Sequence, residues 1–178
     1  MRTPVFELHI LPMFRATDHE HMQAVRLSLS DYDEVRRHAD RILDKLAIDM
    51  PPPLGSGGPG PWPDEWVQLF RRWKESGFKR LELGTAEYTF RQTPTRVTIE
   101  ASGTFPAAGY EGWLEIESET ATSKTYVLHF EPPDVPVAGA GQEFSRRESY
   151  RISSATQAVL VHDSTGVRQL NAPADPPG

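Results

Sequence analysis

The hydrophobic period of the sequence changes once, close to Gly77, and this change constrains the fold more than any other feature. Before Gly77, apolar residues recur at helical spacing. After it, short β-branched and aromatic runs alternate with polar residues and are separated by Gly, Pro, Ser and Asp. We therefore predict an α+β protein with a small helical unit over residues 1–80, an antiparallel β-sandwich over 81–172, and a flexible tail over 173–178.

Two helices are predicted in the first part. One spans residues 31–47, with Ser30 and Asp33 as capping residues, and the prolines after Met50 stop it. The other begins at Pro63, a residue suited to a first helical turn, and ends near Gly77. Residues 4–15 are expected to form a short helix or an extended arm, and residues 16–30 a loop or broken helix. The apolar face of the first helix consists of Val35, Ala39, Ile42, Leu43 and Leu46.

Charge and the lack of cysteine exclude several classes of function. The net charge of −6 argues against general binding to nucleic acid or to an anionic membrane. Without cysteine the chain can form no disulfide, no thiolate metal site and no covalent c-type haem. Glu7 and His9 interrupt the apolar character of the N-terminus, and no run approaches the about 18 apolar residues of a membrane helix. We expect a soluble, cytoplasmic protein.

Four segments of the first part stand out by their order. They are Ile10-Leu11-Pro12-Met13-Phe14, Asp18-His19-Glu20-His21-Met22, Met50-Pro51-Pro52, and an aromatic segment with Val67, Phe70, Trp73 and Gly77. This order resembles that of the small bacterial c-type cytochromes. In that family an apolar residue and Pro-x-Phe precede C-x-x-C-H, which tethers the haem and supplies its first axial ligand. A helix follows, and then a Met-Pro-Pro loop supplies the second ligand. The similarity covers roughly 70 residues and implies about three helices around a small core.

The chain departs from that family at the attachment motif. Asp18 and His21 stand at the two cysteine positions, and Met22 stands at the position of the axial histidine. Covalent haem attachment is therefore impossible. The resemblance implies a haemless, degenerate form of the cytochrome-c-like domain.

Three interpretations of these residues remain open. In the first, Asp18, His19 and His21 form a solvated or capping cluster, and the aromatic stripe is core. In the second, His19 or His21 binds a metal or a non-covalent haem together with Met50. The third is a non-haem iron site with two histidines and one carboxylate, made of Asp18, His19 or His21, and a distant His9 or His38. His38 by itself is expected to be a partly exposed helical histidine.

The second part loosely resembles immunoglobulin-like β-sandwich modules, a resemblance that carries no catalytic residue. The sequence contains no nucleophile elbow, no H-E-x-x-H and no P-loop motif. His129 and His162 alternate with apolar neighbours and are expected to face solvent. A cleft lined by Tyr110, Trp113 and His129 would instead suit a cofactor-free tailoring enzyme acting on a small molecule.

The sequence thus favours a non-catalytic accessory or binding protein without a cofactor. Its expected partner is another protein, such as a metalloenzyme or oxidoreductase that it serves as subunit or chaperone. The expected contact surface is the exposed part of Trp62, Trp66 and Trp73. The alternative is an oxidoreductase or electron carrier that uses a metal or non-covalent haem at Asp18, His19, His21 and Met50.

Overall fold

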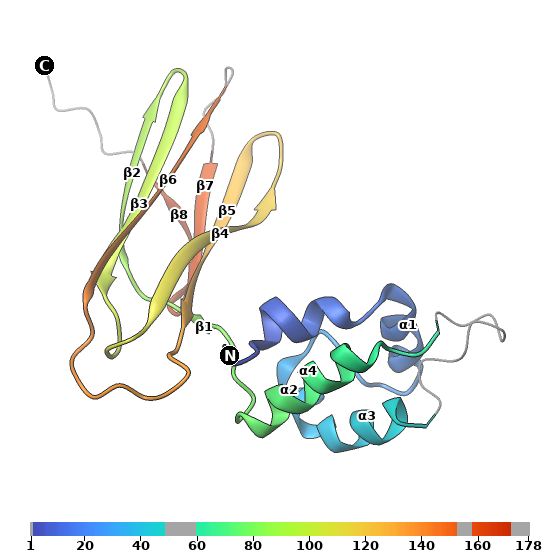
Figure 1. Cartoon of the computed structure of the whole chain (residues 1–178). Helices are drawn as coiled ribbons and strands as arrows, with labels where there is room; N and C mark the ends of the chain where they lie inside the picture. The colour runs from blue at the N-terminus through green and yellow to red at the C-terminus, as the bar shows by residue number, and fades with distance from the viewer. Residues whose placement is uncertain (1, 49–59, 153–157, 172–178) are drawn as a thin grey trace, which may run out of the picture. The chain divides into compact units, whose positions relative to one another are not determined.

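The chain divides into two compact units, Met1–Arg80 and Leu81–Gly178 (Figure 1). The structure, a computed structural model, describes residues 2–48, 60–152 and 158–171. The first unit is helical and the second is made of strands, so the predicted α+β class is confirmed. Met50 and the predicted tail lie outside the described residues. None of the helices in the described part of the chain has the length and apolar character that crossing a membrane requires.

The helical unit begins with two short irregular helices, followed by four α-helices. The first two cover the segment predicted as a short helix or arm, and α1 occupies most of the segment predicted as a loop or broken helix. The elements are η1 (Phe6–Ile10, a π-helix), η2 (Leu11–Met13, a 3-10 helix), α1 (Ala16–Ala24), α2 (Tyr32–Arg37), α3 (Ala39–Leu46) and α4 (Asp64–Glu75).

Helix α4 confirms the prediction made from Pro63, which is its N-cap residue. Acidic residues occupy its first turn and basic residues its last turn, which complements the helix dipole at both ends. The chain leaves the helix through Gly77, whose φ of 91° only glycine adopts without strain. Local sequence signals therefore determine both ends of this helix.

The helix predicted over residues 31–47 is divided at His38, where φ is −102° and ψ is 11°. Its cap also differs from the prediction. Asp31, not Ser30, caps α2, and its Oδ1 accepts a hydrogen bond from the Glu34 amide at 3.0 Å. The Ser30 hydroxyl lies 3.0 Å from the Ser28 hydroxyl instead.

The core of the helical unit is built around Trp73, which is fully buried. The rings of Phe6, Tyr32, Phe70 and Phe78 surround the indole at centroid distances of 5.5, 6.1, 5.3 and 4.9 Å. The indole Nε1 donates a hydrogen bond to the Lys79 carbonyl at 2.8 Å, so its one polar group is paired. This packing corrects the expectation that Trp73 belongs to a partner surface, because none of it reaches solvent.

The second unit contains two sheets. Strands β2, β3 and β6 form one, and β4, β5, β7 and β8 form the other, with β1 also paired to β5. Strand β5 pairs with β7 in parallel, which corrects the prediction of a wholly antiparallel unit. The strands are β1 (Glu82–Leu83), β2 (Glu87–Thr93), β3 (Arg96–Thr104), β4 (Glu111–Glu119), β5 (Ser123–Glu131), β6 (Glu143–Arg151), β7 (Ala158–Asp163) and β8 (Gly166–Leu170).

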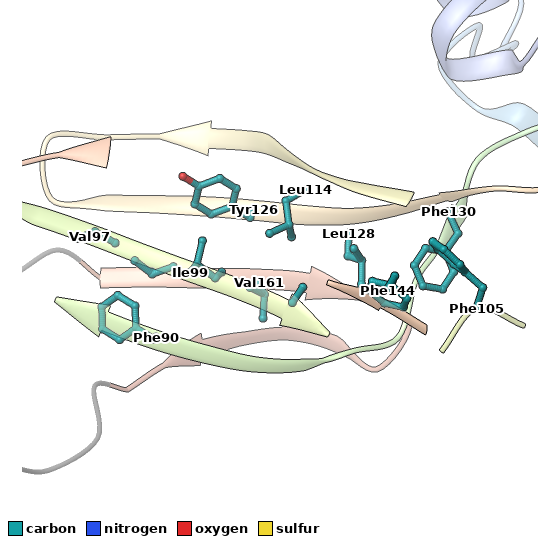
Figure 2. Close-up of a cluster of buried hydrophobic side chains, with 12 residues drawn as sticks. Phe90, Val97, Ile99, Phe105, Leu114, Tyr126, Leu128, Phe130, Phe144 and Val161 are labelled. Atoms are coloured by element: carbon teal, nitrogen blue, oxygen red, sulfur yellow. The ribbon is translucent and has the colours of Figure 1, made fainter. Parts of the chain in front are cut away.

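Side chains from both sheets form a single apolar core (Figure 2). Phe105, Phe130 and Phe144 lie together at one end of it, with centroids 4.6 to 5.3 Å apart. The Phe130 ring also lies against two glycines. A Cβ atom at Gly84 would come within 2.6 Å of this ring, and one at Gly112 within 2.8 Å. The two glycines therefore provide the space that the phenyl ring occupies.

The turn between β7 and β8 is held by Asp163, a buried carboxylate. Its Oδ1 accepts hydrogen bonds from the Thr165 amide at 2.9 Å and the Thr165 hydroxyl at 2.6 Å. Its Oδ2 lies 3.0 Å from Nη2 of Arg168. Burial opposes ionisation of this group, but the Thr165 hydrogen bonds and the Arg168 charge outweigh it and hold the pKa of Asp163 below its usual value.

We expect Gly112→Ala to lower the free energy of unfolding by about 1–3 kcal/mol, because the added methyl overpacks the Phe130 ring. Phe130→Leu should lower it through lost burial. The double variant should lose less than the sum of the two, because the leucine frees space for the methyl. Urea unfolding of the four proteins, followed by circular dichroism, measures this coupling. Strictly additive losses would show that the ring and the glycine are not in contact.

The Asp163→Asn variant should be less stable at pH 7 by about 2 kcal/mol, since a charged acceptor of several hydrogen bonds is lost. The folded pKa is depressed, so this stabilisation is present above the unfolded pKa of about 3.9 and is lost as the pH falls through the folded pKa. The difference in the free energy of unfolding between the variant and the parent protein should therefore become smaller below about pH 4. Hydrogen exchange of the β7 and β8 amides in urea measures it. Glu143→Gln, at an exposed carboxylate, is the control, and it should change the free energy of unfolding little at any pH.

Candidate functional site

A pocket of about 530 Å³ opens in the helical unit between α1 and α3. This volume lies within the range of about 300–1,000 Å³ that is typical of small-molecule sites. Most of its wall is apolar. The apolar lining residues are Phe14, Met22, Val25, Leu27, Leu29, Ile42, Leu46, Ile48 and Trp62, and the polar ones are Asp18, His21, Arg26, His38, Arg41 and Lys45.

Helix α1 forms one wall of the pocket. Its lining residues Asp18, His21 and Met22, and Val25 directly after the helix, follow one another at intervals of three, one and three, which places them on one side. No residue of α1 is buried. A helix that buries no side chain gains little from tertiary packing, although such packing is what stabilises most short helices. Filling the pocket would supply α1 with an apolar partner.

The opposite wall comes from α3 and from His38 directly before it. The lining residues His38, Arg41, Ile42, Lys45 and Leu46 again share one helical face. Ile42 and Leu46 are half-buried, and Arg41 and Lys45 are exposed. This wall thus presents an apolar stripe with cationic side chains beside it.

Trp62 contributes a third part of the wall. Only 6% of the residue is exposed, and its ring packs against Phe14 at 5.5 Å and against Trp66 at 5.8 Å. Its Nε1 is buried and has no hydrogen-bond partner among the described residues. A buried donor without an acceptor is costly, so a ligand that offers an acceptor would be favoured here. Trp62 is therefore a pocket residue, not the exposed contact residue that the sequence indicated.

Arg26, at the end of α1, adopts a conformation that is unusual for its residue type. Its φ is +59°, in the left-handed region. The Arg26 amide donates a hydrogen bond to the Gln23 carbonyl, and the Leu27 amide donates one to the Met22 carbonyl, both at 2.9 Å. This is the Schellman pattern, and its left-handed position is usually taken by glycine. An arginine here bears backbone strain that glycine would avoid, and its side chain lines the pocket.

The residues predicted as metal ligands are only partly brought together. Asp18 and His21 line the pocket, but Asp18 Oδ2 also accepts a hydrogen bond from the Arg15 amide at 2.8 Å, as the cap of α1. His19 packs edge-on against Phe14, at 6.2 Å between ring centroids. Met50 lies outside the described residues. Across residues 2–48, 60–152 and 158–171 no three His, Asp or Glu side chains are arranged to hold a metal ion.

The remaining histidines of the helical unit differ in surroundings. His9 Nδ1 accepts a hydrogen bond from the amide of Val5, the N-cap residue of η1, at 3.0 Å. This nitrogen therefore already has a partner within its own segment. His38 is half-buried, as expected for a helical histidine, and lines the pocket with His21. The proposed site of two histidines and one carboxylate is therefore not assembled through His9. The two imidazoles available to a pocket ligand are those of His21 and His38.

The β unit does not contain the cleft considered from its sequence. Trp113 and His129 pack against each other at 5.9 Å, whereas Tyr110 packs against the core residue Phe130 at 6.5 Å. Successive residues of a strand point to opposite faces of the sheet, and Phe130, which Tyr110 contacts, directly follows His129 in β5. The three side chains therefore do not line one cavity.

His129 and His162 lie on the same face of the β unit, and each pairs with a carboxylate. His162 Nδ1 lies 2.8 Å from Glu117 Oε1, and His129 Nε2 lies 3.5 Å from Glu115 Oε2. Burial lowers the pKa of His129 despite the two acidic neighbours. The expectation that His129 faces solvent holds only in part, because its side chain is 17% exposed and its Nδ1 is buried without a partner among the described residues.

The three cationic pocket residues, Arg26, Arg41 and Lys45, were not singled out from the sequence. The spacing of Arg41 and Lys45 beside Ile42 and Leu46 was a usable signal, since residues three and four apart share a helix face. Arg26 gave no signal, because its left-handed backbone is visible only in the folded chain.

Comparisons of the chain with protein-family models, with characterised proteins and with solved structures found no match. The pocket and the residues that form it are therefore the features from which a function can be inferred.

We expect Asp18→Ala to destabilise α1 by about 1 kcal/mol, because the Arg15 amide loses its acceptor. Hydrogen exchange of the α1 amides measures the loss as faster local opening. Glu20→Ala, an exposed carboxylate on the same helix, is the control. Equal protection of α1 in Asp18→Ala and in the parent protein would contradict the capping role.

Proposed function

We propose that this chain is a non-catalytic binding protein and that the pocket between α1 and α3 is its ligand site. The observation that carries the proposal is an open cavity of about 530 Å³ whose wall is mostly apolar. Val25 and Ile48, both on its wall, are 66% and 71% exposed. Large apolar side chains that remain exposed around a concavity are typical of ligand or partner sites. These features suit the binding of a ligand and do not require a catalytic residue.

We propose further that the helical unit is a haemless cytochrome-c-like domain. The support is that Asp18, His21 and Met22, which stand at the positions of the attachment motif, all line the pocket. In such a domain the ligand cavity would occupy the place of the haem. The β unit is proposed to be an immunoglobulin-like sandwich, supported by its two sheets around one core. Such a pair suits an accessory subunit or chaperone of a metalloenzyme or oxidoreductase.

A second candidate function is a carrier of non-covalently bound haem or metal. The pocket residues fit a haem chemically. The walls are apolar, His21 and His38 offer imidazoles, and Met22 offers a thioether. A haem bound there would supply one-electron redox chemistry. The chain's own contribution would be to exclude water with its apolar walls and to offer an imidazole to the iron.

The proposal predicts that the protein binds Nile red, an uncharged apolar dye, with a dissociation constant in the range of about 1–100 μM. Ile42→Trp should weaken this binding at least about tenfold, because the larger ring fills the cavity. Dye fluorescence measures the binding, and circular dichroism checks that the variant folds. Val167→Trp, which adds the same ring at an exposed position of the β unit, should bind like the parent protein. Unchanged binding by Ile42→Trp would contradict the assignment of the pocket.

A further inference from the structure

The polar part of the pocket wall is cationic, although the chain as a whole carries a net charge of −6. Arg26, Arg41 and Lys45 line the pocket, and Asp18 is the one carboxylate beside them among the lining residues that the structure describes. The Asp18 carboxylate already accepts the hydrogen bond of the Arg15 amide. Among residues 2–48, 60–152 and 158–171, none of the three cations forms an ion pair. The described part of the wall thus carries three cations against one carboxylate, which leaves an excess of positive charge.

The strained backbone of Arg26 adds an independent observation. Glycine at this left-handed position would remove the strain, and it would also remove a guanidinium from the pocket wall. Residues with strained backbones cluster at functional sites. Phe78 is also left-handed, with φ of 63°, but its ring packs against Trp73 in the core, whereas the Arg26 side chain lines the pocket. A guanidinium recognises a carboxylate through paired hydrogen bonds.

The apolar part of the wall indicates the other half of the ligand. Met22 and Val25 from α1 lie across the pocket from Ile42 and Leu46 of α3. An apolar body between them would remove these side chains from water. The buried Nε1 of Trp62, without an acceptor among the described residues, adds one hydrogen-bond donor to the same wall.

From the cations, the strained arginine and the apolar walls, we infer that the pocket binds an amphipathic carboxylate. Its apolar body lies between α1 and α3, and its carboxylate is bound by Arg26, Arg41 and Lys45. The inference rests on the proposed function, since it specifies the ligand of the same pocket. A fatty acid and a porphyrin with propionate groups share this chemistry, and the experiment separates the two.

The test compares decanoate with decanol, which has the same alkyl chain and no charge. The full-length protein is titrated with each, and tryptophan fluorescence reports binding, because Trp62 belongs to the pocket wall. We expect decanoate to bind about tenfold more tightly than decanol, and the preference to decrease with added salt. The double variant Arg41→Gln/Lys45→Gln should lose most of this preference. Arg37→Gln, an exposed arginine outside the pocket wall, is the matched control and should keep it.

Arg26→Gly separates a binding role from a structural one. This variant should be more stable than the parent protein, because glycine relieves the left-handed strain. It should nevertheless bind decanoate about fivefold more weakly, with decanol binding unchanged. A stabilised variant with unchanged decanoate affinity would remove Arg26 from the site.

Equal affinity for decanoate and decanol would overturn the inference and leave the proposed pocket intact. Binding of neither compound, together with no binding of Nile red or protoporphyrin IX, would overturn both. Titration with protoporphyrin IX distinguishes a porphyrin ligand from a linear one. If it binds and decanoate does not, and the cation variants weaken it, the carboxylate inference holds for a porphyrin ligand. If decanoate alone binds, the inference holds for a linear ligand.

Discussion

The burial of Trp73 is the interaction on which the helical unit depends. Four aromatic rings contact the indole, and they come from η1, α2, α4 and the segment after α4. Aromatic side chains bury large areas, so this cluster supplies much of the apolar burial in a unit of this size. It also explains the position of the pocket. The cluster draws on η1, α2 and α4, and α1 contributes no buried residue to it. The pocket lies beside α1, where the core does not extend.

Cationic groups at the pocket connect this packing to function. Helix α3 presents its apolar face toward the pocket and carries Arg41 and Lys45 beside that face. Long basic side chains often run along apolar surface with their charge in water, so such residues are by themselves unremarkable. The additional feature is Arg26, which is held at a backbone conformation that favours glycine. The combination of apolar walls, an excess of positive charge and local strain is what makes this pocket specific in its chemistry.

Local sequence signals predicted the individual elements with some success. Pro63, the acidic first turn and Gly77 delimit α4, because helix caps and dipole effects act within one or two turns. The alternating runs in β2, β3, β4 and β7 were recognised, since each places its more buried residues at every second position, and the run in β5 was recognised although that strand also buries consecutive residues. Strand β6 was missed. Most of its residues are exposed and many are charged, so it carries little apolar alternation. The parallel pairing of β5 with β7 was also missed, because strand direction depends on how the chain crosses over between sheets.

The candidate site was predictable only in part. The segment with Asp18, His21 and Met22 was recognised as unusual, and it lines the pocket. Asp18 acts as a helix cap, which is a local role that the sequence left open. The predicted partner surface was wrong for Trp73 and Trp62, because the spacing that defines an aromatic stripe does not state whether that stripe faces the core or solvent.

The sequence by itself determined the class of the fold, the place where helices give way to strands, and the impossibility of covalent haem. These follow from periodicity and from the lack of cysteine, which are properties of neighbouring residues or of composition. The tertiary structure alone decided that α1 and α3 enclose a pocket, that three cations gather on its wall, and that Arg26 adopts a left-handed backbone. These features depend on which helix faces are left uncovered once the aromatic core has packed, and that outcome is set by contacts between residues distant in the sequence.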